Sequence, residues 1–160
     1  IFASGNLDEY SVAELLMQGA PIDGFGIGTK LDTSADVPYL ECAYKLMEYA
    51  GEPRLKKSSG KATYPGRKQV FRLVQDKRML GDTIGLETER QDGTPLIRKV
   101  MAGGKRLEKP EPLRELARRT KEQLHLIPPS LRRLTGTGSY PVAISDALIH
   151  LKEETERRLF

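Results

Sequence analysis

The sequence predicts an α/β fold over its first 50 residues, followed by a β-hairpin region and a C-terminal helical segment. Three observations support this prediction. Two short apolar segments flank an amphipathic one within the first 30 residues, short β-branched runs alternate with polar turns in the middle of the chain, and leucines recur at helical spacing near its end. The expected regions are residues 1–50, 51–110 and 111–160.

The first region is expected to contain a strand–helix–strand unit. Residues 1–4 (IFAS) and 21–27 (PIDGFGI) have the apolar character of buried strands, and between them Ser11 and Glu14 have the spacing of a helix capping box. Gly19 is a typical helix stop. A helical crossover makes two strands parallel, so their C-terminal ends are expected at one edge of the sheet, where α/β folds bind ligands.

Small and polar residues follow both expected strands. Glycine weakens a strand unless a backbone or a ligand must come close. The backbone N–H groups of such loops can hold a phosphate, whereas close packing and an ordinary turn are the alternatives that the residues leave open. The candidate phosphate-binding residues are Ser4, Gly5 and Asn6 after the first strand and Gly26, Gly28 and Thr29 after the second.

Residues 51–68 form a predicted basic loop that is rich in Gly, Pro and Ser. Such a charge run is most often a solvated surface. The alternative is a cationic loop that grips a polyanion such as pyrophosphate, in which hydroxyl groups donate further hydrogen bonds. The candidate residues for this role are Lys56, Lys57, Ser58 and Lys61.

Further strands are expected in the middle of the chain. Residues 70–74 and 83–88 are predicted to be two strands around a polar turn, and residues 96–101 another strand. Residues 40–49 fit the period of a strand and that of a helix equally well.

Two helices are predicted near the C-terminus. Pro112 opens the first of them, and Ser145 caps the second. His125 and His150 lie within these helices without metal-ligand spacing or a neighbouring nucleophile, so we expect structural roles for both and predict no catalytic residue and no metal site. Cys42 is expected to be a small core residue.

The composition narrows the class of protein. The chain has 160 residues, of which 38% are hydrophobic and 30% charged, and one cysteine, which excludes an internal disulfide. Without a long apolar run or a signal segment, we expect a cytoplasmic protein with no membrane partner. The net charge of +4 favours anionic partners, but no dense basic stripe indicates nucleic acid. The sequence opens directly on an apolar strand, so we expect a C-terminal portion of a longer enzyme or one piece of a cut chain.

Three blocks of sequence carry a resemblance to a known family. They are S-G-x-L-D-E, G-F-G-x-G-T and S-x-G-K-x-T-x-P-G-x-K-Q-V-x-R, in this order. Together they closely resemble the C-terminal part of nicotinate phosphoribosyltransferases. This resemblance implies the synthesis of nicotinate mononucleotide and pyrophosphate from nicotinate and phosphoribosyl pyrophosphate, with coupled ATP hydrolysis, in NAD salvage. It also implies Mg²⁺, a homodimer, and the last part of an incomplete TIM-like α/β barrel of the type II phosphoribosyltransferases, joined to a second domain.

Site residues carry over from the family only where the motifs match. The resemblance implies that Gly28 and Thr29 hold the 5′-phosphate through backbone N–H groups and that Ser4, Gly5 and Asn6 face the same phosphate. Lys61 and its neighbours would lie near pyrophosphate or nucleotide phosphates. The family's phosphorylated histidine lies upstream of these motifs, so the 160-residue chain alone is expected to be inactive. The alternatives are a non-catalytic phosphate-binding or interaction module and a relative that uses nicotinamide or quinolinate.

Overall fold

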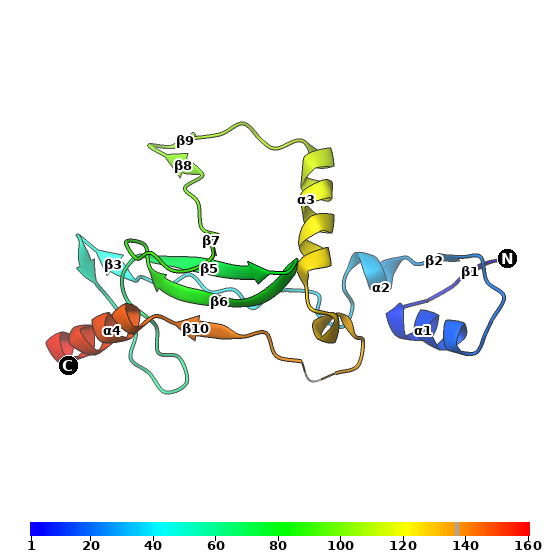
Figure 1. Cartoon of the computed structure of the whole chain (residues 1–160), viewed down its shortest axis with the longest axis horizontal. Coiled ribbons are helices and arrows are strands. Elements are labelled where there is room, and N and C mark those ends of the chain that lie inside the picture. The colour runs from blue at the N-terminus through cyan, green and yellow to red at the C-terminus, as the bar shows by residue number, and fades with distance from the viewer. Residues whose placement is uncertain (137) are drawn as a thin grey trace. The chain divides into compact units, whose positions relative to one another are not determined.

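The computed structural model describes residues 1–136 and 138–160 of the chain. Contacts within the chain divide it into two compact units, Ile1–Tyr44 and Lys45–Phe160 (Figure 1). Within the described residues, no helix is long and apolar enough to cross a membrane.

The first unit is the predicted strand–helix–strand unit with a short additional helix. It contains β1 (Phe2–Ser4), α1 (Glu9–Met17), β2 (Gly24–Gly26) and α2 (Thr29–Asp32). β1 and β2 are parallel, and Ser4 pairs with Gly26 at the end of the register. The parallel pairing predicted from the helical crossover is therefore confirmed, although both strands are only three residues long.

Helix α1 begins earlier than the sequence motif suggested. Its N-cap is Asp8, and Ser11 is the third helical residue. The Asp8 carboxylate accepts a hydrogen bond from the Ser11 backbone at 2.8 Å, and the Ser11 hydroxyl accepts one from the Asp8 backbone at 2.8 Å. The predicted box between Ser11 and Glu14 is therefore wrong, because Asp8, three residues upstream, caps the helix and both predicted box residues lie inside it. The predicted stop at Gly19 is confirmed, with a φ of +71°.

The apolar side chains of the first unit are largely exposed. Phe2 in β1 is 79% exposed, and Cys42 is exposed as well, so the predictions of a buried first strand and a core cysteine are wrong for this structure. The physical reason is that a two-stranded sheet with one short helix has too little surface to cover its own apolar residues.

The second unit is built on a four-stranded sheet with the order β10–β6–β5–β7. β5 (Lys68–Gln75) and β6 (Arg78–Leu86) form a long antiparallel hairpin. Its two-residue turn, Asp76 and Lys77, has φ values of +50° and +58°, as the twist of a tight hairpin requires. The two strands predicted at 70–74 and 83–88 are therefore confirmed, but with other bounds: the first is longer at both ends, and the second begins at Arg78 and already ends at Leu86.

Two strands complete this sheet. β10 (Val142–Ile144) adds in parallel to β6, and the sequence did not indicate it. β7 (Thr94–Pro95) adds to β5. Beyond β7, the Ile97 backbone pairs with the side chain of Gln69 rather than with the backbone of a neighbouring strand. The Gln69 amide donates to the Ile97 carbonyl and accepts from the Ile97 N–H, both at 2.8 Å. Residues 96–100 are consequently not a strand, which corrects the prediction for 96–101.

Two small hairpins lie outside this sheet. They are β3 (Glu48–Tyr49) with β4 (Glu52–Pro53), and β8 (Met101–Ala102) with β9 (Lys105–Arg106). Of the ambiguous segment 40–49, only the last two residues form regular structure, as a strand.

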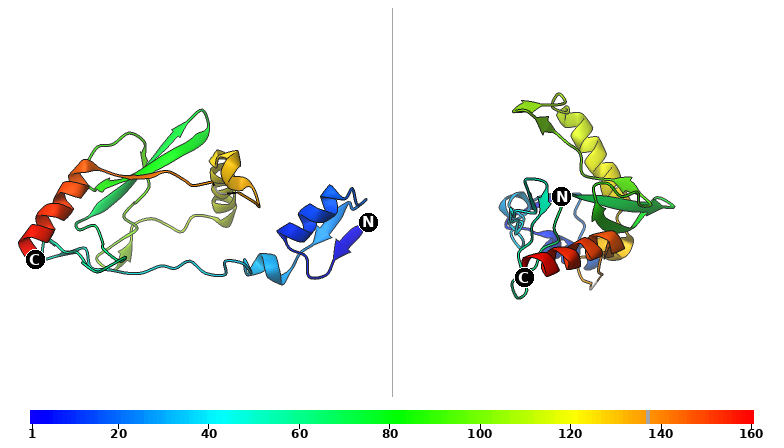
Figure 2. Two further views of the ribbon diagram at one scale, coloured as in Figure 1. Left: turned by 90° about the horizontal axis from the view of Figure 1, so that it is seen from below. Right: turned by 90° about the vertical axis from the view of Figure 1, so that its left-hand side faces the viewer.

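Helices α3 (Leu113–Leu126) and α4 (Asp146–Leu159) follow the predictions, with the short 3₁₀ helix η1 (Pro129–Arg132) after α3. Both long helices contact β6, and Figure 2 shows them near opposite ends of the β5–β6 hairpin. Ser145 caps α4 by accepting a hydrogen bond from the Leu148 N–H at 3.2 Å, as predicted. The core of the unit includes Phe71, Met79 and Leu148, each at most 6% exposed.

Candidate functional site

The parallel register brings the two predicted phosphate loops to one edge of the β1–β2 sheet. Ser4 is paired with Gly26, so the turn that follows β1 and the turn that follows β2 leave the sheet side by side. In the first turn, Gly5 and Asn6 have φ values of +112° and +52°. In the second, Gly28 is the residue immediately before α2. The sequence-predicted residues therefore lie in two adjacent turns.

The three glycines near the end of β2 have different reasons for lacking a side chain. A Cβ at Gly24 would lie 2.5 Å from the Phe2 ring, and one at Gly26 would lie 3.2 Å from the Ser4 Cβ. A Cβ at Gly28 would have nothing within 4 Å. Packing against β1 thus explains Gly24 and Gly26, whereas the space beside Gly28 is open.

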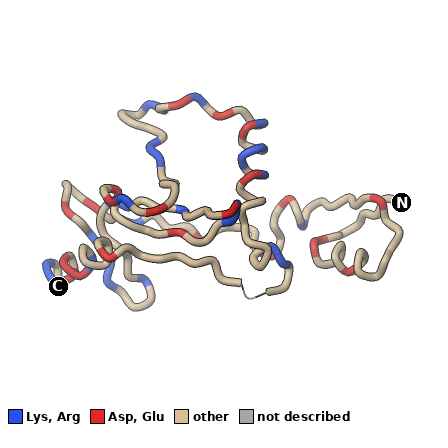
Figure 3. The backbone as a smooth tube through the Cα atoms, viewed as in Figure 1, with Lys and Arg blue, Asp and Glu red and all other residues tan. Residues whose placement is uncertain are grey.

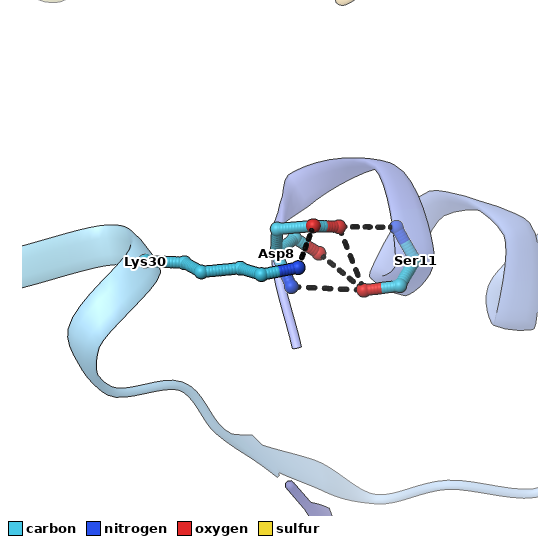
Figure 4. A network of polar contacts seen from close by, with 3 residues as sticks. All are labelled: Asp8, Ser11 and Lys30. Carbon is cyan, nitrogen blue, oxygen red and sulfur yellow. Dashed lines mark hydrogen bonds and ion pairs between the residues drawn. The ribbon is translucent and has the colours of Figure 1, made fainter. Parts of the chain in front are cut away.

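An ion pair that the sequence did not reveal joins the two turns (Figure 4). Lys30, two residues beyond Gly28, donates to the Asp8 Oδ2 at 2.6 Å. The opposite carboxylate oxygen, Oδ1, accepts from the Ser11 N–H and hydroxyl, each at 2.8 Å. The hydrogen bond from Lys30, followed by those from Ser11, holds the pKa of Asp8 well below its ordinary value. Only the parallel pairing of the strands brings residues 8 and 30 together, and no sequence spacing indicates it.

The basic loop is anchored at its base by a partly buried lysine. Lys68 donates to the carbonyl oxygens of Tyr64 at 2.7 Å and Gly66 at 2.6 Å. Burial lowers the pKa of Lys68. Arg67 lies 3.0 Å from Glu48. These two cations are therefore structural members of the loop.

The outer part of the loop holds the predicted polyanion-binding residues. Lys57 lies 3.9 Å from the Glu156 carboxylate and 5.1 Å from the centre of the Phe160 ring, so α4 already engages its charge. Lys56 and Lys61 are exposed, and the Lys61 N–H closes a turn with the Ser58 carbonyl at 3.0 Å. The Ser58 hydroxyl oxygen is buried without a hydrogen-bond partner in the described chain.

The histidines have local partners. The His125 Nδ1 lies 2.6 Å from the Lys121 carbonyl oxygen, and the His150 Nε2 lies 3.1 Å from Glu154, in each case within one helix. Among the described residues, no group of three or more His, Cys, Asp or Glu side chains is arranged to hold a metal ion. The described residues therefore do not fit a Mg²⁺ site. Asp8 is the carboxylate nearest the two turns in sequence, and it already forms an ion pair with Lys30.

A second polar cluster lies in the sheet of the second unit. Arg72 donates two hydrogen bonds to Asp82, at 2.9 and 2.8 Å, and the Tyr140 hydroxyl donates a third at 2.8 Å. The hydrogen bonds from Arg72 are the main cause of the lowered pKa of Asp82. The donors of Arg72 and Tyr140 are both paired with the Asp82 carboxylate. We therefore interpret the cluster as structural: it links β5, β6 and the segment before β10. Over most of the backbone basic and acidic residues are interspersed, whereas residues 54–68 carry Lys and Arg without Asp or Glu (Figure 3).

Comparison with known proteins places these observations in one family. The model of the nicotinate phosphoribosyltransferase C-terminal domain matches residues 91–152. The nicotinate phosphoribosyltransferase pncB2 of Mycobacterium tuberculosis is 48% identical over 151 residues, covering 93% of this chain and 33% of the relative. The nicotinate phosphoribosyltransferase of Bos taurus is 32% identical over 184 residues, covering 99% of this chain and 34% of the relative.

The fold agrees with a solved member of the same family. The crystal structure of human nicotinic acid phosphoribosyltransferase matches with a TM-score of 0.74 and 26% identity, covering 96% of this chain and 32% of that one. The chain thus spans about a third of the length of the curated relatives that it matches. The matched C-terminal domain, the similarity over nearly the whole chain and the shared fold lead to one conclusion: the chain belongs to the nicotinate phosphoribosyltransferase family, as a C-terminal portion.

Proposed function

We propose that this chain supplies the ribose-5-phosphate-binding edge of a nicotinate phosphoribosyltransferase. The whole enzyme would form nicotinate mononucleotide and pyrophosphate from nicotinate and phosphoribosyl pyrophosphate, with coupled ATP hydrolysis. The observation that carries the proposal is the open space at Gly28, next to Ser4 at the end of β1 and the turn that contains Gly5 and Asn6. Residues 1–50 would close an incomplete α/β barrel, and residues 51–110 and 111–160 would belong to the second domain.

The proposed role of these turns is positioning. The N–H groups of Gly28 and Thr29 open α2, where backbone donors have no acceptor within the helix. With the Thr29 hydroxyl they would hold the phosphate on C5 of the ribose, while the bond that breaks is at C1. Such contacts are equally strong in the bound substrate and in the transition state, so their loss is expected to raise KM with little change in kcat.

The basic loop is proposed to bind the pyrophosphate end of the substrate or the phosphates of ATP. Its tip carries Lys56 and Lys61. The Ser58 hydroxyl, which is buried without a partner among the described residues, is proposed as a further donor. Lys57 would contribute less than these two lysines, because Glu156 partly neutralises its charge.

We expect Lys61→Ala to weaken the binding of inorganic pyrophosphate to the full-length protein by about threefold to tenfold, as for the loss of one charge-assisted contact. Lys57→Ala is the matched control on the same loop, and it should have a smaller effect. Isothermal titration at low and high salt measures both, and the difference should shrink as salt screens the charges. Equal losses in the two variants would count against a special role for Lys61.

The activity itself is tested on the full-length protein that contains this chain. The purified protein, given nicotinate, phosphoribosyl pyrophosphate and ATP, should form nicotinate mononucleotide, and residues 1–160 alone should form none. If product forms only from nicotinamide or only from quinolinate, nicotinate is not the substrate and that base takes its place in the proposal. Binding of ribose 5-phosphate without turnover of any of the three bases would indicate a non-catalytic module. The native mass of the full-length protein, compared with the mass of its own single chain, tests the homodimer that we propose for the cytoplasmic enzyme.

A further inference from the structure

The ion pair between Asp8 and Lys30 connects the two turns of the proposed phosphate site. Asp8 comes directly after the turn that contains Gly5 and Asn6, and Lys30 comes two residues after Gly28. Their charged atoms are 2.6 Å apart, and the side chains are 23% and 35% exposed. Apart from the short β1–β2 ladder, this contact is a direct link between the segments that follow the two strands.

The Asp8 carboxylate has little freedom to move. One of its oxygens is held by the backbone and hydroxyl of Ser11 at the start of α1, and the other accepts from Lys30 (Figure 4). Helix α1 therefore orients the carboxylate, and the carboxylate in turn fixes the first turn of α2. Helix α1 thus fixes Asp8, and Asp8 fixes Lys30 and, with it, the Gly28 turn.

Lys30 is poorly suited to bind a phosphate itself. Its ammonium is already paired, and the hollow beside it, of about 220 Å³, is lined by Asp8, Glu9 and Asp36 among others. Three carboxylate side chains around this hollow would repel a phosphate that approached the ammonium from that side. The contact is thus better suited to holding backbone than to holding a ligand.

We propose that Asp8 and Lys30 are positioning residues of the ribose-phosphate site, whose ion pair holds the Gly28 turn at a fixed distance from the turn that follows β1. This inference rests on the proposed function. An ion pair that is still partly exposed adds little to the stability of a fold. The expected effect of this ion pair is on binding, because a turn that is already ordered loses less conformational entropy when the phosphate binds.

The test uses the full-length protein with ribose 5-phosphate as the probe. Asp8→Asn breaks the ion pair but leaves an amide oxygen that still caps α1, and Lys30→Met breaks it from the other side. Each is expected to weaken binding by about threefold to tenfold, and the double variant by no more than either single one. Lys30→Arg should restore most of the affinity. The affinity for nicotinate should stay unchanged in all four variants, which a general loss of structure would not allow.

The matched control is Glu108→Gln, which breaks the ion pair with Arg98 in the second unit by the same acid-to-amide change. It should bind ribose 5-phosphate as the unaltered protein does. If Lys30→Met weakens binding far more than Asp8→Asn does, Lys30 binds the phosphate directly and the positioning role is wrong. If neither variant changes the affinity while Gly28→Val does, the proposed site stands and the inference fails. If Gly28→Val also leaves the affinity unchanged, the phosphate site itself is misplaced.

Discussion

Replacing Gly28 with valine in the full-length protein is expected to weaken the binding of ribose 5-phosphate by at least about tenfold and to leave the folded structure intact. The backbone of Gly28 has a φ of −117° and a ψ of −119°, and a Cβ there would have no atom within 4 Å. A valine would therefore occupy only space that the proposed phosphate needs. Titration calorimetry with ribose 5-phosphate measures the loss.

A neighbouring glycine offers the matched control for this experiment. An alanine at Gly24 would place its Cβ 2.5 Å from the Phe2 ring, so this change should lower the melting temperature through lost packing between β1 and β2. Gly28→Val should lower the melting temperature less than Gly24→Ala does, because no atom lies within 4 Å of the new Cβ. Unchanged affinity in Gly28→Val would remove Gly28 from the phosphate site. A melting temperature as low as that of Gly24→Ala would mean that structure, rather than a ligand, explains this glycine too.

The largest effect on stability is expected from Asp82→Ala. This change leaves the Arg72 guanidinium and the Tyr140 hydroxyl without their shared acceptor, and the Arg72 and Asp82 side chains are only 25% and 11% exposed. Breaking a pair that is mostly buried from one side is expected to lower the free energy of unfolding by about 2 to 4 kcal/mol. This chain contains no tryptophan, so urea unfolding followed by circular dichroism measures the loss, with hydrogen exchange of residues 68–86 as the local readout.

The stability that Asp82 contributes has a defined dependence on pH. Arg72 lowers the pKa of Asp82 below its ordinary value of 3.8 in the folded protein. The contribution is therefore fully present above that ordinary value and is lost as the pH falls through the lower, folded value. The difference between the unaltered protein and Asp82→Ala should thus be constant from about pH 5 to pH 8 and shrink as the pH falls below 3.8.

A double variant separates lost bonds from lost packing. Arg72→Met with Asp82→Leu removes both charges and keeps similar volumes, so it should recover most of the stability that Asp82→Ala loses. A loss of less than about 0.5 kcal/mol in Asp82→Ala would show that the cluster is an exposed pair of little consequence. If the double variant is as unstable as Asp82→Ala, the Tyr140 hydroxyl, rather than the unpaired guanidinium, dominates the loss.

Local signals in the sequence were sufficient for several elements of the fold. Helical spacing of leucines together with Pro112 and Ser145 located α3 and α4, because capping and periodicity act within a few residues. β-branched runs around a polar turn located the β5–β6 hairpin for the same reason. Where two residues could cap the same helix, the sequence did not decide between them. Ser11 was predicted as the cap, but Asp8, whose negative charge is favourable at a helix start, is the cap in the structure.

The sequence by itself also determined the family, because its three motifs are specific and occur in the family's order. It determined as well that two glycine-bearing turns lie at one edge of a sheet, because a helical crossover requires parallel strands. Only the tertiary structure decided between the two explanations for the glycines, since whether a missing Cβ faces Phe2, Ser4 or open space depends on the strand register. The same holds for the Asp8–Lys30 pair and for β10, whose partners lie 22 and about 60 residues away along the chain. Contacts at such separations are set by packing, which no short stretch of sequence encodes.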